Sequence, residues 1–171
     1  ADAKLAERLR SLRIHGSPRK YYHEEVGFNS RLDTLQAAVL LVKFKYLDGW
    51  TAARQRNADR YRSVLANSAA PVRFQTVPSF VTRHVINQFI IRVPLRDRLK
   101  AFLADRGIGT EVYYPLPLHR QPCFASLGYR EGDFPASENL ANQSLALPVY
   151  PELAEEDLQA VCAAIGQYYA G

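Results

Sequence analysis

Residues 27–38 read GFNSRLDTLQAA, a polar turn that runs directly into a long helical pattern. Ser30 and Asp33 form an S-x-x-D capping pattern at this junction. The first turn of a helix leaves backbone N–H groups without partners and carries the positive end of the helix dipole. The junction therefore predicts a site for an anion such as a phosphate.

The helical pattern extends from about Arg31 to about Asn67. Apolar side chains recur along it at helical spacing, at Leu32, Leu35, Val39, Val42, Tyr46 and Trp50. We expect Gly49 to bend or split this helix. A helix this long in a chain of 171 residues either links two lobes or lies along a subunit interface.

The flanking segments predict helices and strands in alternation. A stripe of leucines predicts a helix over 2–13, which ends at Gly16-Ser17-Pro18. Beyond the long helix we expect a loop at 69–78, strands at 84–93, 110–114 and 145–148, helices at 95–106, 135–144 and from Glu155, and a helical turn at 119–127. This pattern predicts a compact α+β layer.

Composition narrows the class of protein. The chain is long enough for one domain with a core, and it contains no apolar run of about 20 residues, so we expect no membrane span. The start of the chain is charged and does not resemble a secretory signal. Cys123 and Cys162 form neither a metal spacing nor a disulfide framework, which predicts a reduced, cytoplasmic setting.

The charge pattern favours a small anionic ligand. With 22 Lys+Arg against 17 Asp+Glu, the net charge of +5 suits either a nucleic acid or an acidic small molecule. Aromatic residues are not interleaved with the basic ones in a nucleic-acid-binding pattern, so we expect no nucleic-acid partner. The four histidines lack metal-ligand spacing, and we expect no metal site.

Five motifs together resemble one enzyme family along essentially the whole chain. They are VGFNSRLD at 26–33, YPLPLH at 114–119, LGY at 127–129, FPxxE at 134–138 and LALP at 145–148. This order and spacing resembles the DegT/DnrJ/StrS family of PLP-dependent nucleotide-sugar aminotransferases. The segment KYYHE at 20–24 is similar to members that aminate dTDP-linked keto-deoxysugars.

The resemblance implies the C-terminal portion of a fold-type-I PLP aminotransferase. The α/β fold would end in an α+β small domain, with a short, mainly antiparallel sheet and flanking helices. Residues 1–30 would be the tail of the large PLP domain and a ligand loop. Residues 31–68 would form the linking helix, and residues 69–171 the small domain.

Asn29 is the candidate cofactor residue. From the residues alone, an asparagine in a glycine-containing turn favours a structural Asx turn. The resemblance instead implies that Asn29 donates to the PLP phosphate of the neighbouring subunit, which requires a homodimer. Arg31 could bind phosphate or substrate through its planar fork, or could pair with a local acid such as Asp33 or Glu25.

The candidate substrate residues are Lys20, Arg31, Tyr113, Tyr114 and His119. The resemblance implies that a basic residue at Lys20 approaches substrate from the partner subunit, although an isolated loop lysine is commonly only solvated. It also implies that residues of the motif T-x-x-[HY]-Y-P-x-P-x-H line the sugar pocket. In a strand, Tyr113 and Tyr114 would face opposite sides. A lone His119 is more often structural than catalytic.

The implied reaction is transfer of an amino group, typically from glutamate, to a keto group on a dTDP- or UDP-linked deoxysugar. None of the lysines present (Lys4, Lys20, Lys43, Lys45 and Lys100) lies in the family's Schiff-base context, so we expect no catalytic residue and no activity from this chain alone. Three explanations follow, in decreasing order of preference. The chain would be a fragment of a full enzyme, a chain that pairs with a separate chain carrying the lysine, or a stand-alone remnant. The alternatives from another class are a non-catalytic binding or interaction module and a basic nucleic-acid-binding protein.

Overall fold

The computed structural model describes residues 2–171, and their contacts divide the chain into two units. The first unit ends at Leu47, and the second is Asp48–Gly171. This boundary lies inside the segment 31–68 that we expected to be one linking helix. The three-part division at residues 30 and 68 itself stays a prediction.

The first unit begins with helix α1, Ala3–Leu12, as the leucine stripe predicted. Asp2 caps this helix, because its carboxylate accepts hydrogen bonds from the N–H of Lys4 at 3.0 Å and of Leu5 at 3.1 Å. Leu5 and Leu9 remain 55% exposed, so the apolar stripe of α1 is not covered within residues 2–171.

After α1 the chain turns back against its own helix end. The N–H of His15 donates to the carbonyl of Phe28 at 2.9 Å, and the N–H of Phe28 donates to the carbonyl of Leu12 at 2.7 Å. Gly16 and Gly27 meet where the two segments touch, and a Cβ on Gly27 would overlap the backbone nitrogen of Gly16. Only residues without a Cβ allow this close approach of backbone to backbone.

The expected long helix is two helices. Helix α2 spans Thr34–Phe44 and helix α3 spans Leu47–Ala66, with the break at Lys45 and Tyr46. The expected bend or split at Gly49 is therefore wrong in position, since the helix divides before Gly49 and Gly49 lies inside α3. None of the helices in residues 2–171 is long and apolar enough to cross a membrane.

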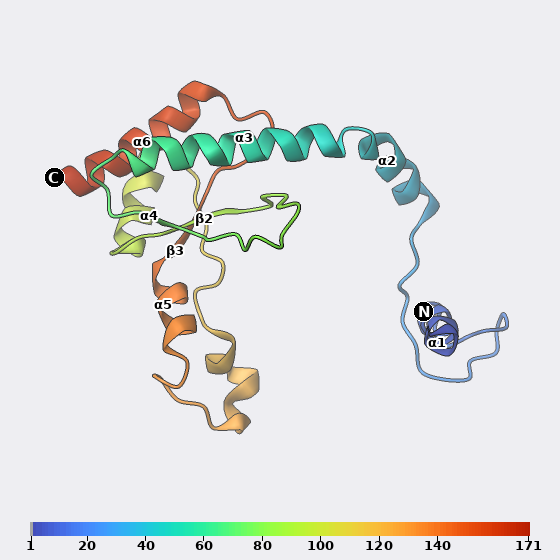
Figure 1. The fold of residues 1–171 in the computed structure, drawn as a ribbon. Helices are drawn as coiled ribbons and strands as arrows, with labels where there is room; N and C mark the ends of the chain where they lie inside the picture. The colour runs from blue at the N-terminus through green and yellow to red at the C-terminus, as the bar shows by residue number, and fades with distance from the viewer. Residues whose placement is uncertain (1) are drawn as a thin grey trace. The chain divides into compact units, whose positions relative to one another are not determined.

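The second unit is built on a three-stranded antiparallel sheet (Figure 1). Its strand order is β1 (Arg73–Phe74), β2 (Phe89–Arg92) and β3 (Ser144–Leu147). Phe89 pairs with Leu147 and Arg92 with Ser144, so the central strand is fully paired along β3. The sheet confirms the expected short antiparallel sheet. Strand β1 lies in a segment expected to be a loop, and the expected strand at 84–93 is shorter.

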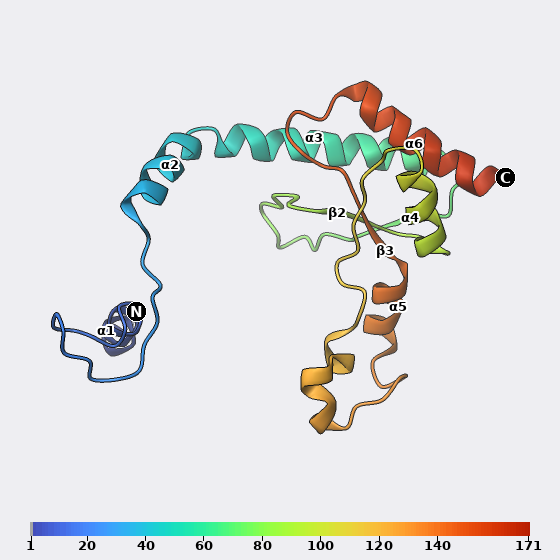
Figure 2. The ribbon, with the colours of Figure 1, turned by 180° about the vertical axis from the view of Figure 1, so that it is seen from behind.

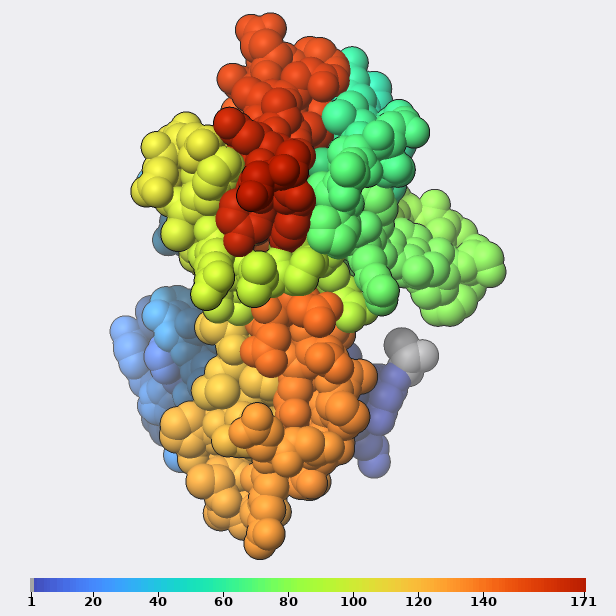
Figure 3. All heavy atoms as spheres, turned by 90° about the vertical axis from the view of Figure 1, so that its left-hand side faces the viewer, coloured from blue at the N-terminus to red at the C-terminus, as the bar shows by residue number. Residues whose placement is uncertain are grey.

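Three helices pack against this sheet and enclose the core. They are α3, α4 (Arg96–Ala104) and α6 (Glu155–Ala170). Figure 2 shows the same helices from behind, and Figure 3 shows α6 lying between α4 and α3. The largest fully buried side chains are Tyr61, Leu65, Ile91, Val93, Leu99, Leu103, Leu145, Leu158 and Ile165. These residues come from β2 and the residue after it, from β3 and from all three helices, which is why the flanking-helix prediction holds.

The segment between α4 and β3 carries two 3-10 helices and one α-helix. They are η1 (Leu118–Arg120), η2 (Pro122–Leu127) and α5 (Pro135–Gln143), close to the expected turn and helix. The expected strand at 110–114 is wrong. Of residues 110–114, only Glu111 pairs with the sheet, through a single bridge to Ala146. The chain then bends at Tyr113.

Candidate functional site

Asn29 and Arg31 form an exposed pair in the turn before α2. The Nε of Arg31 donates to the Oδ1 of Asn29 at 3.3 Å. The backbone around them is held in place, because Asn29 bridges to Ile14 and the N–H of Ser30 donates to the carbonyl of Arg13 at 2.9 Å. The side-chain NH2 of Asn29 has no partner among residues 2–171, which leaves amide and guanidinium donors free for an oxyanion.

The N-terminus of α2 is capped by a side chain of its own. The helix begins at Thr34, and the carboxylate of Asp33 accepts a hydrogen bond from the N–H of Leu35 at 2.8 Å. Asp33 itself is therefore the cap, and Ser30 is not. A negative side chain therefore already complements this end of the helix dipole.

Neither acid proposed as a structural partner pairs with Arg31. The carboxylate of Glu25 lies 3.4 Å from the Nε of Arg8, and Asp33 caps α2. The structure therefore leaves Arg31 paired only with the neutral amide of Asn29 among the described residues.

Lys20 stands at the tip of a tight turn in the first unit. Arg19 and Tyr22 form an isolated bridge, and the hydroxyl of Ser17 donates to the Arg19 carbonyl at 2.7 Å. The ammonium of Lys20 lies 5.0 Å from the ring centre of Tyr21, and both side chains are exposed. The turn thus presents a cation and an aromatic ring together at the surface.

Tyr113 and Tyr114 do not alternate across a strand. Their ring centres are 5.9 Å apart and the rings meet edge to face at 75°. The chain bends at Tyr113, so the expectation that the two side chains face opposite sides is wrong. Tyr113 is 40% exposed and Tyr114 is 74% exposed, which makes Tyr113 the more enclosed of the two.

Tyr113 lines a pocket of about 320 Å³, which we call the Tyr113 pocket. Its polar wall is formed by Asn87, Gln88, Thr110, Glu111 and Tyr113. The remaining lining comes from Gly109 and from the apolar segment 146–149. The bridge from Glu111 to Ala146 holds the two sides together, with hydrogen bonds of 3.2 and 2.8 Å.

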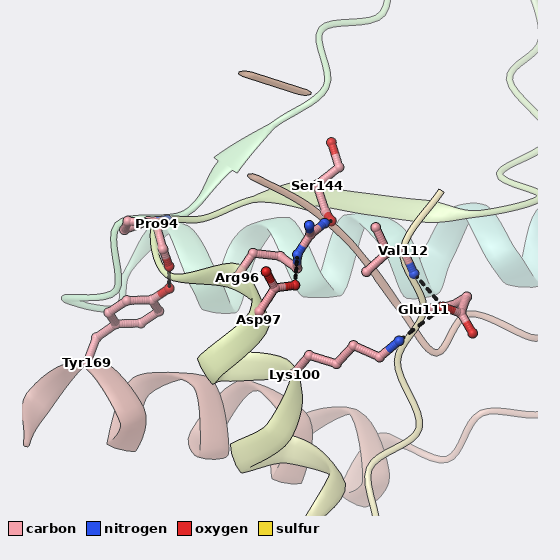
Figure 4. Close-up of polar contacts among 8 residues, drawn as sticks. All are labelled: Pro94, Arg96, Asp97, Lys100, Glu111, Val112, Ser144 and Tyr169. Atoms are coloured by element: carbon pink, nitrogen blue, oxygen red, sulfur yellow. Dashed lines mark hydrogen bonds and ion pairs between the residues drawn. The ribbon is translucent and has the colours of Figure 1, made fainter. Parts of the chain in front are cut away.

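The one carboxylate of this pocket is already neutralised. Figure 4 shows that Glu111 accepts hydrogen bonds from the N–H of Val112 at 2.8 Å and from the ammonium of Lys100 at 3.0 Å. These contacts, the backbone one first, lower the pKa of Glu111 below its ordinary value. Glu111 is therefore ionised and paired at neutral pH, and the pocket offers no unpaired charge.

His119 is placed elsewhere, in an aromatic pocket of about 310 Å³. Its side chain is 8% exposed, and its Nε2 lies 3.0 Å from the carboxylate of Glu138. The ring of Phe134 packs 4.8 Å from its ring centre. His119 is therefore packed and paired, and it does not line the Tyr113 pocket.

Glu138 also holds the loop that follows η2. Both its carboxylate oxygens accept from the N–H of Gly132, at 2.9 and 3.0 Å. Partial burial raises the pKa of Glu138, but the hydrogen bonds from Gly132, His119 and the backbone of Phe134 outweigh it, so the pKa falls below its ordinary value. Glu138 thus connects His119 to the turn at Gly132.

Sequence reasoning did not name three polar residues of the Tyr113 pocket, although one of them, Thr110, opens the motif at 110–119. Asn87 and Gln88 directly precede β2, and Thr110 follows the glycines after α4. For Asn87 and Gln88 the only signal was an amide pair at the start of a strand, which is too common to single out a site. Within residues 2–171, no group of three or more His, Cys, Asp or Glu side chains could hold a metal ion.

Comparison with known sequences finds relatives that include sugar transaminases. A "Pleiotropic regulatory protein" of Geobacillus stearothermophilus is 49% identical over 168 residues, which cover 98% of this chain and 45% of that protein. A dTDP-3-amino-3,4,6-trideoxy-alpha-D-glucose transaminase of Streptomyces venezuelae is 43% identical, over 89% of this chain and 40% of its own. The chain thus spans less than half the length of these relatives.

Solved structures agree with the sequence comparison. The crystal structure of S. venezuelae DesV in complex with a ketimine intermediate superposes with a TM-score of 0.88 at 40% identity, and the match covers 98% of this chain and 44% of that one. The profile of the DegT/DnrJ/EryC1/StrS aminotransferase family matches residues 1–166. The chain therefore belongs to the DegT/DnrJ/EryC1/StrS aminotransferase family.

Proposed function

We propose that this chain is the C-terminal part of a PLP-dependent aminotransferase that acts on a nucleotide-linked keto sugar, with glutamate as the amino donor. The family match over residues 1–166 carries the proposal. Relatives whose names give a substrate are transaminases of dTDP- and UDP-linked sugars, at 43% and 35% identity.

The exposed pair of Asn29 and Arg31 fits the phosphate end of PLP. A phosphate needs several N–H donors at the surface, and this turn offers the unpartnered side-chain NH2 of Asn29 beside a guanidinium. When bound, PLP supplies an electron sink for the proton shift that accompanies amino transfer. Asn29 donates to the phosphate of the PLP that is bound in the neighbouring subunit, so the active form is a homodimer.

Each unit of the chain carries candidate substrate residues of its own. In the first unit, Lys20 and Arg31 supply the cations that a sugar nucleotide's pyrophosphate requires. In the second, Tyr113 and Tyr114 meet the sugar. His119 contributes indirectly, because its pairing with Glu138 fixes the segment between η1 and α5.

The chain requires a lysine from outside itself. Lys100 is engaged by Glu111, and none of the other lysines lies in the family's Schiff-base motif. The apolar side chains of α2 also call for a covering surface, since Leu35 is 74% and Leu41 75% exposed. Both observations support a complete enzyme in which further protein covers α2 and carries the lysine.

The test joins residues 1–171 to the lysine-bearing N-terminal part of the S. venezuelae transaminase. The joined protein should show the visible absorbance band of bound PLP and transfer the amino group of glutamate to a dTDP-linked keto sugar. Residues 1–171 alone should do neither. A joined protein that binds PLP but transfers no amino group to any dTDP- or UDP-linked keto sugar would contradict the proposal.

The role of Asn29 is tested in the same joined protein. Replacing Asn29 with Ala removes a phosphate donor and should weaken PLP retention by about tenfold or more, measured as PLP lost on dialysis. Asn139→Ala, an exposed change on α5, serves as the matched control. Equal PLP retention in the two variants would exclude Asn29 from the phosphate site.

A further inference from the structure

We propose that a further ligand site lies beside His84, in a pocket that binds a small zwitterion of the α-amino-acid class. This His84 pocket has a volume of about 400 Å³ and is built from the second unit alone. Its walls come from α3, from the segment after β1 and from the segment before β2. None of the five motifs that resemble the aminotransferase family contributes a residue to it, so the site goes beyond the proposed function.

The imidazole of His84 provides the first argument. Its Nδ1 is buried and has no hydrogen-bond partner among residues 2–171. The residue is held in place from α3, because the Nε2 of Gln55 donates to the His84 carbonyl at 2.8 Å. A buried polar atom without a partner is unfavourable, and native structures usually satisfy such atoms with protein, water or a ligand. Because His84 lines the pocket, a polar ligand bound there would supply the missing hydrogen bond.

The two charged side chains of the pocket provide the second argument. Arg62 and Asp59 lie one turn apart on α3, and a terminal nitrogen of Arg62 donates to one oxygen of Asp59 at 2.8 Å. The ring of Phe89 lies 5.4 Å from the guanidinium carbon and helps to fix it. The second Asp59 oxygen and the other Arg62 nitrogens have no polar partner in the described part of the chain.

This charge pair selects for a ligand that carries both signs. A ligand that is only negative would be attracted by Arg62 but repelled by Asp59, and a ligand that is only positive would meet the opposite arrangement. A zwitterion pairs its carboxylate with the guanidinium and its ammonium with the free carboxylate oxygen. The pocket therefore matches an α-amino acid, which holds these two charges on one carbon.

The rest of the lining sets the size and polarity of the ligand. Gln75 adds a side-chain amide that both donates and accepts, and Val77 and Ile86 add aliphatic surface. The volume of about 400 Å³ lies toward the small end of ligand pockets, about 300–1,000 Å³, which suits an amino acid rather than a nucleotide. A neutral polar side chain on the amino acid would face the Gln75 amide and the His84 ring nitrogen.

The test is a titration of the ¹⁵N-labelled chain with L-asparagine, followed by NMR. L-Asparagine carries both charges and a neutral amide, and it is not the amino donor of the proposed reaction. It should shift the side-chain amide signals of Gln55 and Gln75. Succinamic acid lacks the ammonium and β-alaninamide lacks the carboxylate, so each should bind about tenfold or more weakly than L-asparagine, the loss of one charge-assisted hydrogen bond. No shift with L-asparagine, or equal binding of either analogue, would overturn the proposal.

Two variants assign the charges of the ligand to their partners. Arg62→Gln should weaken L-asparagine binding by about tenfold and remove the preference over β-alaninamide, which has no carboxylate to lose. Asp59→Asn should remove the preference over succinamic acid in the same way. Arg98→Gln, an exposed change on α4, is the control and should leave all three affinities unchanged. Equal affinity for L-asparagine in Arg62→Gln and Arg98→Gln would refute the site. Amino transfer by the joined protein is measured separately, so the two proposals can fail independently.

Discussion

Replacing Tyr61 with Phe should stabilise the second unit. Tyr61 is fully buried in α3, and its ring stacks on Phe89 with centres 5.1 Å apart and an angle of 15°. Its hydroxyl has no hydrogen-bond partner among residues 2–171. The substitution keeps the stacked ring and removes only the unsatisfied group.

The magnitude follows from two opposing effects. A buried polar group without a partner costs about 1–3 kcal/mol, which the substitution recovers. The space left by the oxygen is on the order of 10 Å³ and costs about 0.2 kcal/mol at ~24 cal/mol per Å³. The free energy of unfolding should therefore rise by about 1–2.5 kcal/mol, and Tm by about 2–4 °C for each kcal/mol.

The assay is denaturant unfolding followed by circular dichroism, with Tyr169→Phe as the control. The hydroxyl of Tyr169 donates to the Pro94 carbonyl at 2.6 Å, so its removal should lower the free energy of unfolding by about 0.5–1.5 kcal/mol (Figure 4). Opposite signs for the two variants would support the reasoning. A Tyr61→Phe protein that loses as much stability as Tyr169→Phe would refute it.

The pH dependence of Tyr61→Phe gives an independent check. Burial, followed by nearby ionisable groups such as Cys162, raises the pKa of Tyr61 far above its ordinary value. The phenol therefore stays protonated in the folded chain, while in the unfolded chain it ionises from about pH 10. The stability linked to the neutral phenol is present below pH 10 and is lost as pH rises above it. The advantage of Tyr61→Phe should therefore grow between pH 8 and pH 11.

Three further substitutions test other contacts. Gly27→Ala should disrupt the turn of the first unit, seen as loss of amide protection in residues 14–29, because a Cβ there overlaps the backbone of the facing segment; protection equal to wild type would contradict it. Arg96→Met should lower the free energy of unfolding by about 1.5–3 kcal/mol, because the buried guanidinium donates to the Ser144 carbonyl at 2.7 Å. An unchanged midpoint of denaturant unfolding would show that this hydrogen bond contributes little. Glu138→Ala should speed hydrogen exchange of the Gly132 amide, because the Glu138 carboxylate accepts a hydrogen bond from it. In the wild type, the protection of the Gly132 amide should fall as pH drops below the lowered pKa of Glu138.

Local patterns in the sequence predicted most helices but not where the long one divides. Apolar spacing continues without interruption from Leu32 to Trp50, so it contains no signal of a break at Lys45 and Tyr46. The break lies beside the boundary between the two units, where α3 begins to bury Thr51 and Ala53 in its own unit. The period of a helix predicts which residues share a face, but it does not predict which unit of the chain that face packs against.

Motifs determined the family from the sequence alone, because residues such as Asn29 and Tyr114 lie in short, contiguous segments that can be recognised without the fold. The strand expected at 110–114 was wrong for a related reason. The β propensity of a segment is a local property, whereas its pairing in a sheet depends on residues far away in the sequence. Only the tertiary structure brought Asn87, Gln88 and Thr110 into one pocket with Tyr113. Residues 87–88 and residues 110–113 are separated along the chain, and the pairing of β2 and of Glu111 with β3 places these two segments together. A pocket made from distant segments depends on long-range contacts, which no local pattern of residues encodes.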